Sequence, residues 1–440
     1  MNINTTEKKT RKFKEEAFYD NNAPYFLLPF RFTRINNKEL IVNELGDYLF
    51  LPLGTFQKIV TRNIDKQLDK EIFNDLLSNF FISEESIPSL LPIIETRYRT
   101  KKSFLDYFTA LHIFVISLRC EHTCHYCQVS RVTENKSAFD MSRFHIDEGI
   151  KLMMKSPNPY LTMEFQGGEA LLAFENIKYA VLKAKKEAEL NNKQITYVIC
   201  TNLAPLTDEM LPFIKEHKIV ISTSLDGPAF IHNKNRHKPQ NNSYELATQG
   251  IKKCREFLGN DSVSALLTTS ALSLDYPIEI VDEYVAQGFP NIFLRPISPY
   301  GFATYNEKKN KYETDRFLEF YKKAFNKILE YNKLGYFLRE DYATIILKKI
   351  MTPFPVGYVD LQSPAGMINS VIVFNYDGKI YASDESRMLA EMKDYTFQLG
   401  TLGKETYNEI FYGEKANKIA EVWLNESLPG CSECAFQNYC

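Results

Sequence analysis

The sequence predicts an α/β fold, a partial (β/α)6 TIM-like barrel between a small N-terminal β-plus-helix module and a C-terminal domain that carries cysteines. From about residue 110, six short apolar strands alternate with longer helical stretches, which is typical of parallel strands joined by right-handed crossovers. The alternation is missing before and after that region. We therefore expect three domains, at residues 1–105, 106–330 and 331–440. A doubly wound sheet fits the same alternation, but six repeats favour the barrel.

Composition limits the class of protein. The chain has 440 residues, of which 44% are hydrophobic and 25% charged, so it is long enough for two or three domains with cores. Its formal charge of -2 and the mixing of acidic and basic residues speak against a nucleic-acid partner. The sequence contains no apolar run of about 18 residues and begins with a polar stretch, so we expect a cytoplasmic protein without membrane contact.

The first hundred residues predict the N-terminal module. Two extended apolar stretches at 24–35 and 39–53 indicate strands, and segments near 54–62 and 68–80 have helical periodicity. The segment 88–102 contains two prolines followed by a basic run, which is typical of a linker.

The central region carries the six repeats. Strands are expected at 111–118, 160–166, 195–201, 220–225, 264–271 and 291–297. Helices are expected between them at 143–155, 173–190, 207–217, 243–257 and 276–287. In a barrel or in a doubly wound sheet, ligands bind at the C-terminal ends of the strands.

After about residue 330 the pattern becomes a tyrosine-rich helical region and then a strand pair at 370–383. That pair has a turn at Tyr376, Asp377 and Gly378. The chain then ends in a cysteine-rich segment, which we interpret as part of a third, smaller domain.

Six of the eight cysteines form two tight groups, Cys120, Cys124 and Cys127, and Cys431, Cys434 and Cys440. In a reducing compartment such groups indicate metal or redox chemistry more than disulfides. Cys200 and Cys254 stand alone in apolar or helical stretches, so we expect both to be buried structural residues.

The first group follows the first strand of the alternating region, in the segment ISLRCEHTCHYCQVSR. A loop at that place can bind three irons of a cubane cluster with three thiolates and leave the fourth iron open for a ligand. A zinc site with His122 or His125 as fourth ligand is the alternative, because both histidines lie in the same loop.

The spacing Cys-x3-Cys-x2-Cys with an aromatic residue before the last cysteine resembles the signature of the radical S-adenosylmethionine (SAM) superfamily. That resemblance implies a [4Fe–4S] cluster on Cys120, Cys124 and Cys127, and Tyr126 against the adenine of SAM. The next expected strand ends in Gly167, Gly168 and Glu169, similar to the family's Gly-Gly-Glu motif, which contacts the methionine amino group. The resemblance implies reductive cleavage of SAM to a 5′-deoxyadenosyl radical that abstracts hydrogen from the substrate.

Other strand ends carry polar residues that can hold the ribose or the methionine carboxylate. They are Asn202, Ser222, Ser224 and Asp226. Arg236 resembles the arginine that radical SAM peptide-modifying enzymes place near the SAM carboxylate. Each of these residues fits a turn or cap role as well, and Arg295 more closely fits a structural ion pair.

The terminal group, Cys431-x2-Cys434-x5-Cys440, is similar to the SPASM domains that hold auxiliary iron–sulfur clusters, with a zinc knuckle as the alternative. Ala382 stands where many SPASM domains have a cysteine, and the sequence stops at Cys440, where the family continues to further cysteines. We therefore expect an auxiliary-cluster domain that is incomplete here.

Several stretches resemble the B-type radical SAM maturase of the His-Xaa-Ser repeat system. They are YFLLPFRFTRI, LIVNELGDYLFLP, CEHTCHYCQVSR, FQGGEALLAF, SLDGPAFIHNKNR, YASDESRMLA and CSECAFQNYC. This resemblance implies a peptide or protein maturase that acts on a His-Xaa-Ser repeat protein, beside a second radical SAM protein and with an external electron donor. Residues 20–80 would bind the precursor by adding its leader as a strand, or would form a structural cap.

Two other functions fit the motifs. One is a sulfatase-maturase-like enzyme that generates formylglycine, because the SLDGP segment and the terminal cysteines suit it equally. The other belongs to a different class, a zinc-stabilised binding protein without catalytic activity.

Overall fold

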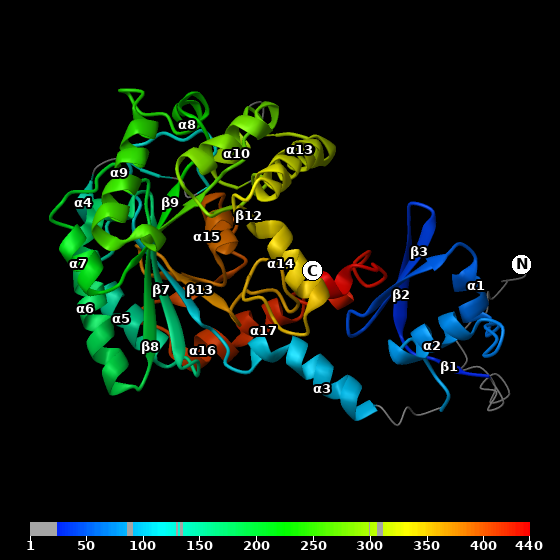
Figure 1. Ribbon diagram of the computed structural model, residues 1–440. Helices are drawn as coiled ribbons and strands as arrows, with labels where there is room; N and C mark the ends of the chain where they lie inside the picture. Colours follow the sequence, from blue (N-terminus) through cyan, green and yellow to red (C-terminus); the bar gives the residue numbers. More distant parts are fainter. Residues whose placement is uncertain (1–23, 86–90, 129–130, 133–134, 299, 306–310) are drawn as a thin grey trace, which may run out of the picture. The chain divides into compact units, whose positions relative to one another are not determined.

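The computed structural model describes residues 24–85, 91–128, 131–132, 135–298, 300–305 and 311–440 (Figure 1). The polar stretch at the start of the chain lies outside these described residues. The chain divides into two compact units, Met1–Lys101 with Pro429–Tyr439, and Lys102–Leu428 with Cys440.

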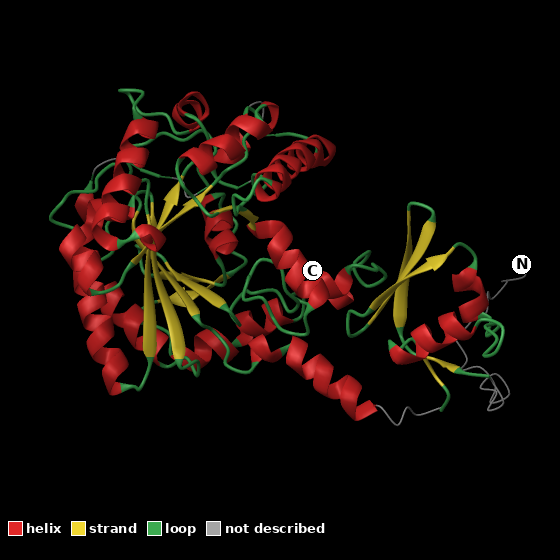
Figure 2. Cartoon of the chain, in the orientation of Figure 1, coloured by secondary structure: helices red, strands yellow, loops and turns green. Residues whose placement is uncertain are grey.

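The larger unit is built on one mixed sheet of eight strands (Figure 2). In chain order these are β6 (Leu111–Ser117), β7 (Tyr160–Gly167), β8 (Gln194–Cys200), β9 (Val220–Ser224), β10 (Val263–Leu266), β13 (Val371–Phe374), β14 (Lys379–Tyr381) and β15 (Gln398–Thr401). In space they follow the order β10-β9-β8-β7-β6-β13-β14-β15. Neighbouring strands from β10 to β13 pair in parallel, as predicted for the central repeats. Six of the seven β6 residues are buried, as expected of a parallel strand covered on both faces.

Helices join and cover these strands. In chain order they are α4 (Lys136–Phe139), α5 (Arg143–Met154), α6 (Phe174–Leu190), α7 (Leu211–Glu216), α8 (Ala229–Asn235), α9 (Ser243–Leu258), α10 (Pro277–Ala286), α11 (Phe302–Tyr305), α13 (Thr314–Lys333), α14 (Asp341–Met351), α15 (Asp384–Glu391), α16 (Tyr407–Tyr412) and α17 (Glu414–Ala420). Figure 1 shows α6, α7 and α9 along the outside of the strands. The helices predicted for the central region are confirmed. Within the described residues, no helix combines the length and the apolar character needed to cross a membrane.

The sixth predicted strand is much shorter than expected. Residues 291–297 form only β11 (Asn291–Ile292), which pairs in parallel with β12 (Arg339–Glu340). An isolated parallel bridge between Thr269 and Pro296 continues the strand order beyond β10. Pro296 lacks a backbone N–H, which explains why a longer ladder does not form at this position.

The predicted strand pair at 370–383 is confirmed as the antiparallel hairpin of β13 and β14. The sequence did not predict its partner, because β13 also pairs in parallel with β6, from Val371 opposite Leu111 to Phe374 opposite Phe114. Residues on both sides of the boundary predicted at 330 therefore share one sheet, and α15 lies in the same unit as the cysteine loop.

The smaller unit contains the predicted β-plus-helix module. Its elements are β1 (Phe26–Leu27), β2 (Phe30–Ile35), β3 (Lys38–Asn43), β4 (Tyr48–Pro52), α1 (Thr55–Val60), α2 (Lys70–Ser78), β5 (Ile82–Ser83) and α3 (Leu91–Lys101). Strands β2, β3 and β4 form an antiparallel sheet with β3 in the centre. The segment expected to be a linker, residues 88–102, is helical in α3, and its residues 88–90 lie outside the described part.

The segment before the last cysteine packs within the smaller unit. The Tyr439 hydroxyl donates to the Gly46 carbonyl oxygen at 2.8 Å, and the Asn438 amide donates to the Asn43 carbonyl oxygen at 2.7 Å. Cys431 and Cys434 therefore belong to the smaller unit, whereas Cys440 is assigned to the larger one.

A charged contact stabilises the larger unit near its first residue. Lys102 Nζ lies 3.0 Å from Glu426 Oε1, and the Ser363 hydroxyl donates to the same carboxylate. Burial alone would raise the pKa of Glu426, but the hydrogen bond from Ser363 and the contact with Lys102 outweigh it and lower the pKa to about 2. Because this folded-state pKa lies below the unfolded value, the stabilisation is present above about pH 4.3 and is lost as the pH falls toward 2.

We expect Glu426→Gln to lower the free energy of unfolding by about 1–2 kcal/mol at pH 7, after allowance for solvent screening. The difference from the parent protein should shrink as the pH falls below about 4. Urea denaturation between pH 7 and pH 3 measures it. Glu414→Gln is the matched control, because the Glu414–Lys418 pair is fully exposed. An equal effect of the two substitutions would contradict the prediction.

Candidate active site

A cavity of about 320 Å³ lies at the carboxyl ends of the parallel strands. Ten of the predicted residues line it: Cys120, Cys124, Tyr126, Cys127, Gly167, Gly168, Asn202, Ser222, Ser224 and Arg236. The carboxyl edge is the place where parallel α/β folds bind their ligands. The structure thus brings together residues from the ends of β7, β8 and β9, from the cysteine loop and from the end of α8.

The cysteine loop is anchored at its base by a buried ion pair. Arg119 Nε lies 2.6 Å from Asp140 Oδ1, and the Ser117 hydroxyl donates to the same oxygen at 2.7 Å. The backbone N–H of Thr123 donates to the His237 carbonyl oxygen at 2.8 Å and holds the middle of the loop. The loop is therefore attached to the larger unit at both places.

The three thiols have the chemistry of a metal-ligand set. Cys120, Cys124 and Cys127 line one cavity, and burial raises the pKa of Cys124 to about 12 and raises that of Cys120 as well. Thiols bind metal as thiolates, so a bound metal would release their protons. The loop supplies three cysteines, and Cys200, which also lines this cavity, comes from the end of β8. The loop by itself therefore fits a cluster with one open iron.

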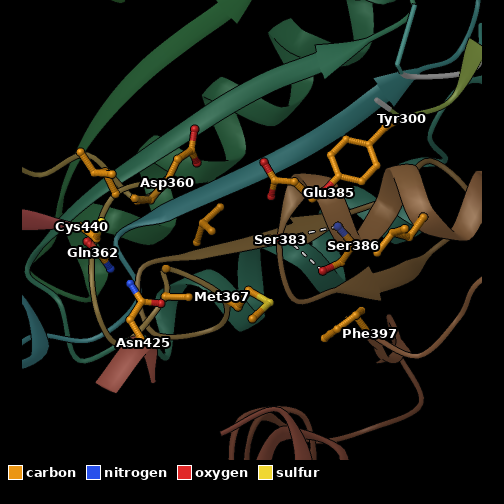
Figure 3. Close-up of a pocket in the computed structure, with 16 residues that line it drawn as sticks. Tyr300, Asp360, Gln362, Met367, Ser383, Glu385, Ser386, Phe397, Asn425 and Cys440 are labelled. Carbon is orange, nitrogen blue, oxygen red and sulfur yellow. Dashed lines mark hydrogen bonds between the residues drawn. The ribbon is translucent and has the colours of Figure 1, made fainter. Parts of the chain in front are cut away.

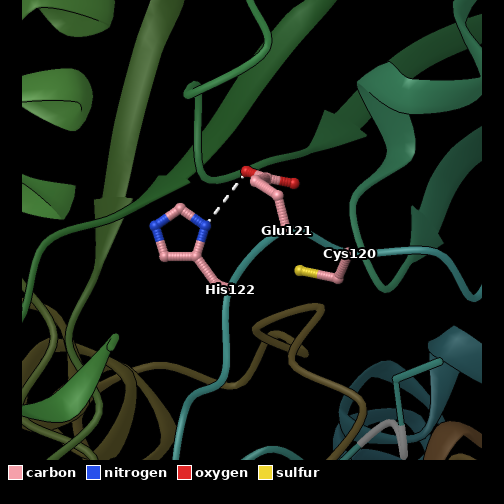
Figure 4. A group of neighbouring side chains, drawn as sticks. All are labelled: Cys120, Glu121 and His122. Carbon is pink, nitrogen blue, oxygen red and sulfur yellow. Dashed lines mark hydrogen bonds and ion pairs between the residues drawn. The ribbon is translucent and has the colours of Figure 1, made fainter. Parts of the chain in front are cut away.

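His122 does not complete a zinc site. Figure 4 shows His122 bonded to Glu121, and these two residues with Cys120 offer ligand atoms within 4.8 Å of one another. However, His122 Nδ1 lies 3.0 Å from Glu121 Oε1, and Nε2 lies 2.8 Å from the Ser243 hydroxyl. Asn202 Nδ2 also donates to the Glu121 carboxylate at 2.9 Å. Both ring nitrogens are therefore occupied within the protein.

His125, the second candidate for a zinc ligand, is also engaged. Its Nε2 lies 3.1 Å from Asn235 Oδ1, an acceptor, so this nitrogen carries a proton. The geometry of the loop therefore favours three protein ligands over a Cys₃His set.

The two glycines of the Gly-Gly-Glu motif are required by a close contact between strand ends. A Cβ atom on Gly167 would lie 2.0 Å from the Ser117 carbonyl oxygen, and one on Gly168 would lie 2.4 Å from that of Leu118. The backbone N–H of Gly168 also donates to the Ser117 carbonyl oxygen at 2.8 Å. The glycines thus let the end of β7 pack directly against the start of the cysteine loop.

We expect Gly168→Ala to lower stability by about 1–3 kcal/mol, because backbone atoms cannot move away from the added methyl group. The cysteine loop should shift, and bound iron per chain should fall by at least half. Iron analysis and thermal unfolding measure both effects. Gly400→Ala is the control, since its nearest neighbour is the end of the flexible Glu405 side chain. Normal iron content in Gly168→Ala would contradict the prediction.

Glu169 lies beneath the cavity and is only 1% exposed. Its carboxylate accepts hydrogen bonds from the Thr201 hydroxyl at 2.6 Å, from Asn202 N at 2.7 Å and from Leu171 N at 2.9 Å. Burial and the neighbouring Glu121 raise the pKa of Glu169 to about 7. In the structure Glu169 holds the end of β8 in place and does not line the cavity.

Asp226 is also fully buried and does not line the cavity. Its carboxylate accepts hydrogen bonds from Arg236 Nε and Nη2 at 3.2 Å each, from Asn235 Nδ2 at 3.3 Å, from Thr268 N at 3.2 Å and from the Tyr126 hydroxyl. Burial would raise the pKa of Asp226, but the Arg236 guanidinium outweighs burial and lowers it. Asp226 thereby joins the cysteine loop to the ends of β9 and β10.

Ten lining residues were not predicted as site residues. They are Gln128, Arg131, Gln166, Cys200, Thr201, Thr223, Leu266, Thr268, Asp384 and Met388. His122, considered above as a zinc ligand, and Arg295, expected in an ion pair, also line the cavity. Cys254 is fully buried as expected, but Cys200, predicted to be equally buried, is partly exposed at the cavity. Arg131 could have been found from its place four residues after Cys127, whereas no local signal indicates Asp384 or Met388.

Cys440 lies at a different cavity of the larger unit, of about 430 Å³. Figure 3 shows it with Ser383, Glu385, Asp360 and Asn425. Cys431 and Cys434 lie in the smaller unit, where the backbone N–H of Cys434 donates to the Cys431 carbonyl oxygen at 3.1 Å. The auxiliary cluster on these three cysteines stays a prediction.

The sequence matches one family model, that of the radical SAM superfamily, over residues 114–284. An uncharacterized protein of Methanothermobacter thermautotrophicus is 30% identical over 191 residues, which cover 43% of this chain and 69% of that protein. A cysteine-type anaerobic sulfatase-maturating enzyme of Clostridium novyi is 23% identical over 334 residues, 74% of this chain and 84% of that enzyme.

Two solved structures share the fold. Native anSMEcpe with bound AdoMet superposes with a TM-score of 0.61 at 20% identity, covering 76% of this chain and 88% of the other. Streptococcus suis SuiB bound to precursor peptide SuiA superposes with a TM-score of 0.51 at 13% identity, covering 94% of both chains. The predicted fold class is confirmed, and the second comparison extends over nearly the whole chain.

Proposed function

This chain belongs to the radical SAM superfamily, and we propose that it is a peptide or protein maturase whose [4Fe–4S] cluster is held by Cys120, Cys124 and Cys127. The superfamily uses such a cluster together with SAM. When bound, the two supply a one-electron cleavage that allows hydrogen abstraction from an unactivated C–H bond. The protein's own residues must then bind SAM, orient the substrate and exclude water.

The observation that carries the proposal is the convergence of three cysteines and an arginine in one cavity at the strand ends. Arg236 is 11% exposed and is aligned by Asp226, so it would meet the methionine carboxylate of SAM as a fixed cation. The Tyr126 ring packs against the Arg236 guanidinium, with 5.4 Å between the ring centroid and Arg236 Cζ. Tyr126 would contact the adenine of SAM. Asn202, Ser222 and Ser224 would supply hydrogen bonds to the ribose.

The substrate we propose is a His-Xaa-Ser repeat protein, modified beside a second radical SAM maturase and with an external electron donor. Support for a peptide substrate comes from the resemblance of seven sequence stretches to that maturase and from the likeness to SuiB, which was solved with a precursor peptide. A formylglycine-generating activity is the second candidate, favoured by the 334-residue match to a sulfatase-maturating enzyme.

The N-terminal module is the proposed site for the leader of the precursor. In its three-stranded sheet, β3 is paired on both sides, so β2 and β4 each have one edge without a partner strand among the described residues. Such an edge offers backbone N–H and C=O groups to an added strand. A structural cap would need no free edge.

Anaerobic purification and co-expression test the proposal. We expect a brown protein with absorbance near about 400 nm that releases 5′-deoxyadenosine after reduction with SAM. Mass spectrometry of a co-expressed His-Xaa-Ser protein should show a changed mass, or deuterium uptake in D₂O if the reaction is an epimerisation. Formylglycine in a co-expressed sulfatase peptide would instead support the second candidate. Colourless protein with stoichiometric zinc after iron reconstitution would refute both.

A further inference from the structure

Arg131 lies in the cavity of the three cysteines, but it belongs to neither of the motifs that predicted this site. It lines the cavity with Cys120 and Cys127. Its neighbour Val132 pairs with the start of the cysteine loop, since Val132 N donates to the Leu118 carbonyl oxygen at 2.9 Å and Cys120 N donates to that of Val132 at 3.3 Å. These two bonds place Arg131 against the backbone that carries Cys120.

The charge of Arg131 is not compensated by the described residues. Its Nε is buried without a hydrogen-bond partner, and no carboxylate of the described chain forms an ion pair with it. The other two arginines of the cavity differ, because Arg236 pairs with Asp226 at 3.2 Å and Arg295 pairs with Asp360 at 3.3 Å. Arg131 as a whole is partly exposed, but leaving its buried Nε without an acceptor is costly, so a negative group is expected beside it.

We propose that Arg131 raises the reduction potential of the cluster by acting as its fixed counter-charge, an inference that rests on the proposed cluster site. Three thiolates give the bound cluster a net negative charge, and reduction adds one more. A nearby cation stabilises the more negative state of the cluster most. Arg131 therefore makes the electron transfer that starts SAM cleavage easier, without contacting SAM itself.

Redox titration of the reconstituted full-length protein, followed by EPR without SAM or peptide, tests the proposal. At the potential where half of the parent cluster is reduced, less than about a tenth should be reduced in Arg131→Gln. Arg131→Lys keeps the charge and should stay close to the parent. Arg316→Gln is the matched control, because Arg316 is half exposed, pairs with Asp275 and does not line the cavity.

The outcomes separate this inference from the proposed function. If the parent protein forms no iron–sulfur cluster, the proposed function itself fails. If the parent has a cluster but Arg131→Gln keeps the parent potential, or Arg131→Lys shifts as far as Arg131→Gln, the inference is wrong. If Arg131→Gln keeps the parent reduction potential but binds SAM more weakly, Arg131 binds SAM and does not tune the cluster. If Arg131→Gln takes up no iron while Arg131→Lys takes up the normal amount, the positive charge is needed at this position, which supports the inference. If neither variant takes up iron, the inference is contradicted.

Discussion

Replacing Cys124 by alanine is expected to abolish the absorbance near 400 nm and the release of 5′-deoxyadenosine. Cys124 lies between the other two cysteines in the loop, and its thiol is enclosed in the cavity that they share. With two thiolates left, the cluster loses one of its three protein attachments, and iron affinity should fall by at least about 100-fold. Iron and sulfide analysis after anaerobic reconstitution measures the loss.

Cys254→Ala is the matched control for this experiment. Cys254 is a fully buried thiol in α9, outside the cavity, so its removal leaves a small hole in the core. We expect a loss of about 1–2 kcal/mol in stability with iron content and SAM cleavage unchanged. If Cys124→Ala kept its iron, or if Cys254→Ala lost it to the same extent, the assignment of the cluster to the loop would be wrong.

The positions of the central strands along the chain could be predicted because each strand gives a local signal in the sequence. Segments such as LHIFVIS are continuous apolar runs of strand length, and each is followed by a longer helical period. Since parallel strands end at one edge, the residues after them were expected to meet, and Asn202, Ser222 and Ser224 do line one cavity.

The contribution of α15 could not be predicted, because it depends on pairing between distant segments. β13 lies about 260 residues after β6 in the chain, and nothing in either sequence specifies the other as its neighbour. Only this pairing brings Asp384 and Met388 to the cavity of Cys120.

Residue type at a strand end was easier to predict than the direction of the side chain. Glu169 and Asp226 were both expected at the cofactor, yet each is nearly or fully buried and accepts several hydrogen bonds from the protein. A carboxylate after a strand can point into the cavity or beneath it, and the local sequence is the same in both cases. Their roles toward SAM therefore stay predictions, whereas their structural roles follow from the hydrogen bonds.

Asp226→Asn is expected to lower the free energy of unfolding of the larger unit by about 3 kcal/mol, because it leaves the Arg236 guanidinium buried without its counter-charge. An amide has only one acceptor oxygen, so it cannot satisfy the donors that now meet both carboxylate oxygens. The variant should also bind less iron, since Tyr126 of the cysteine loop loses its hydrogen-bond acceptor. Urea denaturation and iron analysis measure the two effects.

A double-mutant cycle shows whether the loss comes from this ion pair. If Asp226 acts mainly through Arg236, then Asp226→Asn in an Arg236→Gln background should cost much less than about 3 kcal/mol. Asp208→Asn is the control, because the Asp208–Lys253 pair is largely exposed and should contribute less than about 1 kcal/mol. Additive effects of the two cavity substitutions would mean that Asp226 stabilises the strand ends through Asn235 and Thr268, with Arg236 held independently in the cavity.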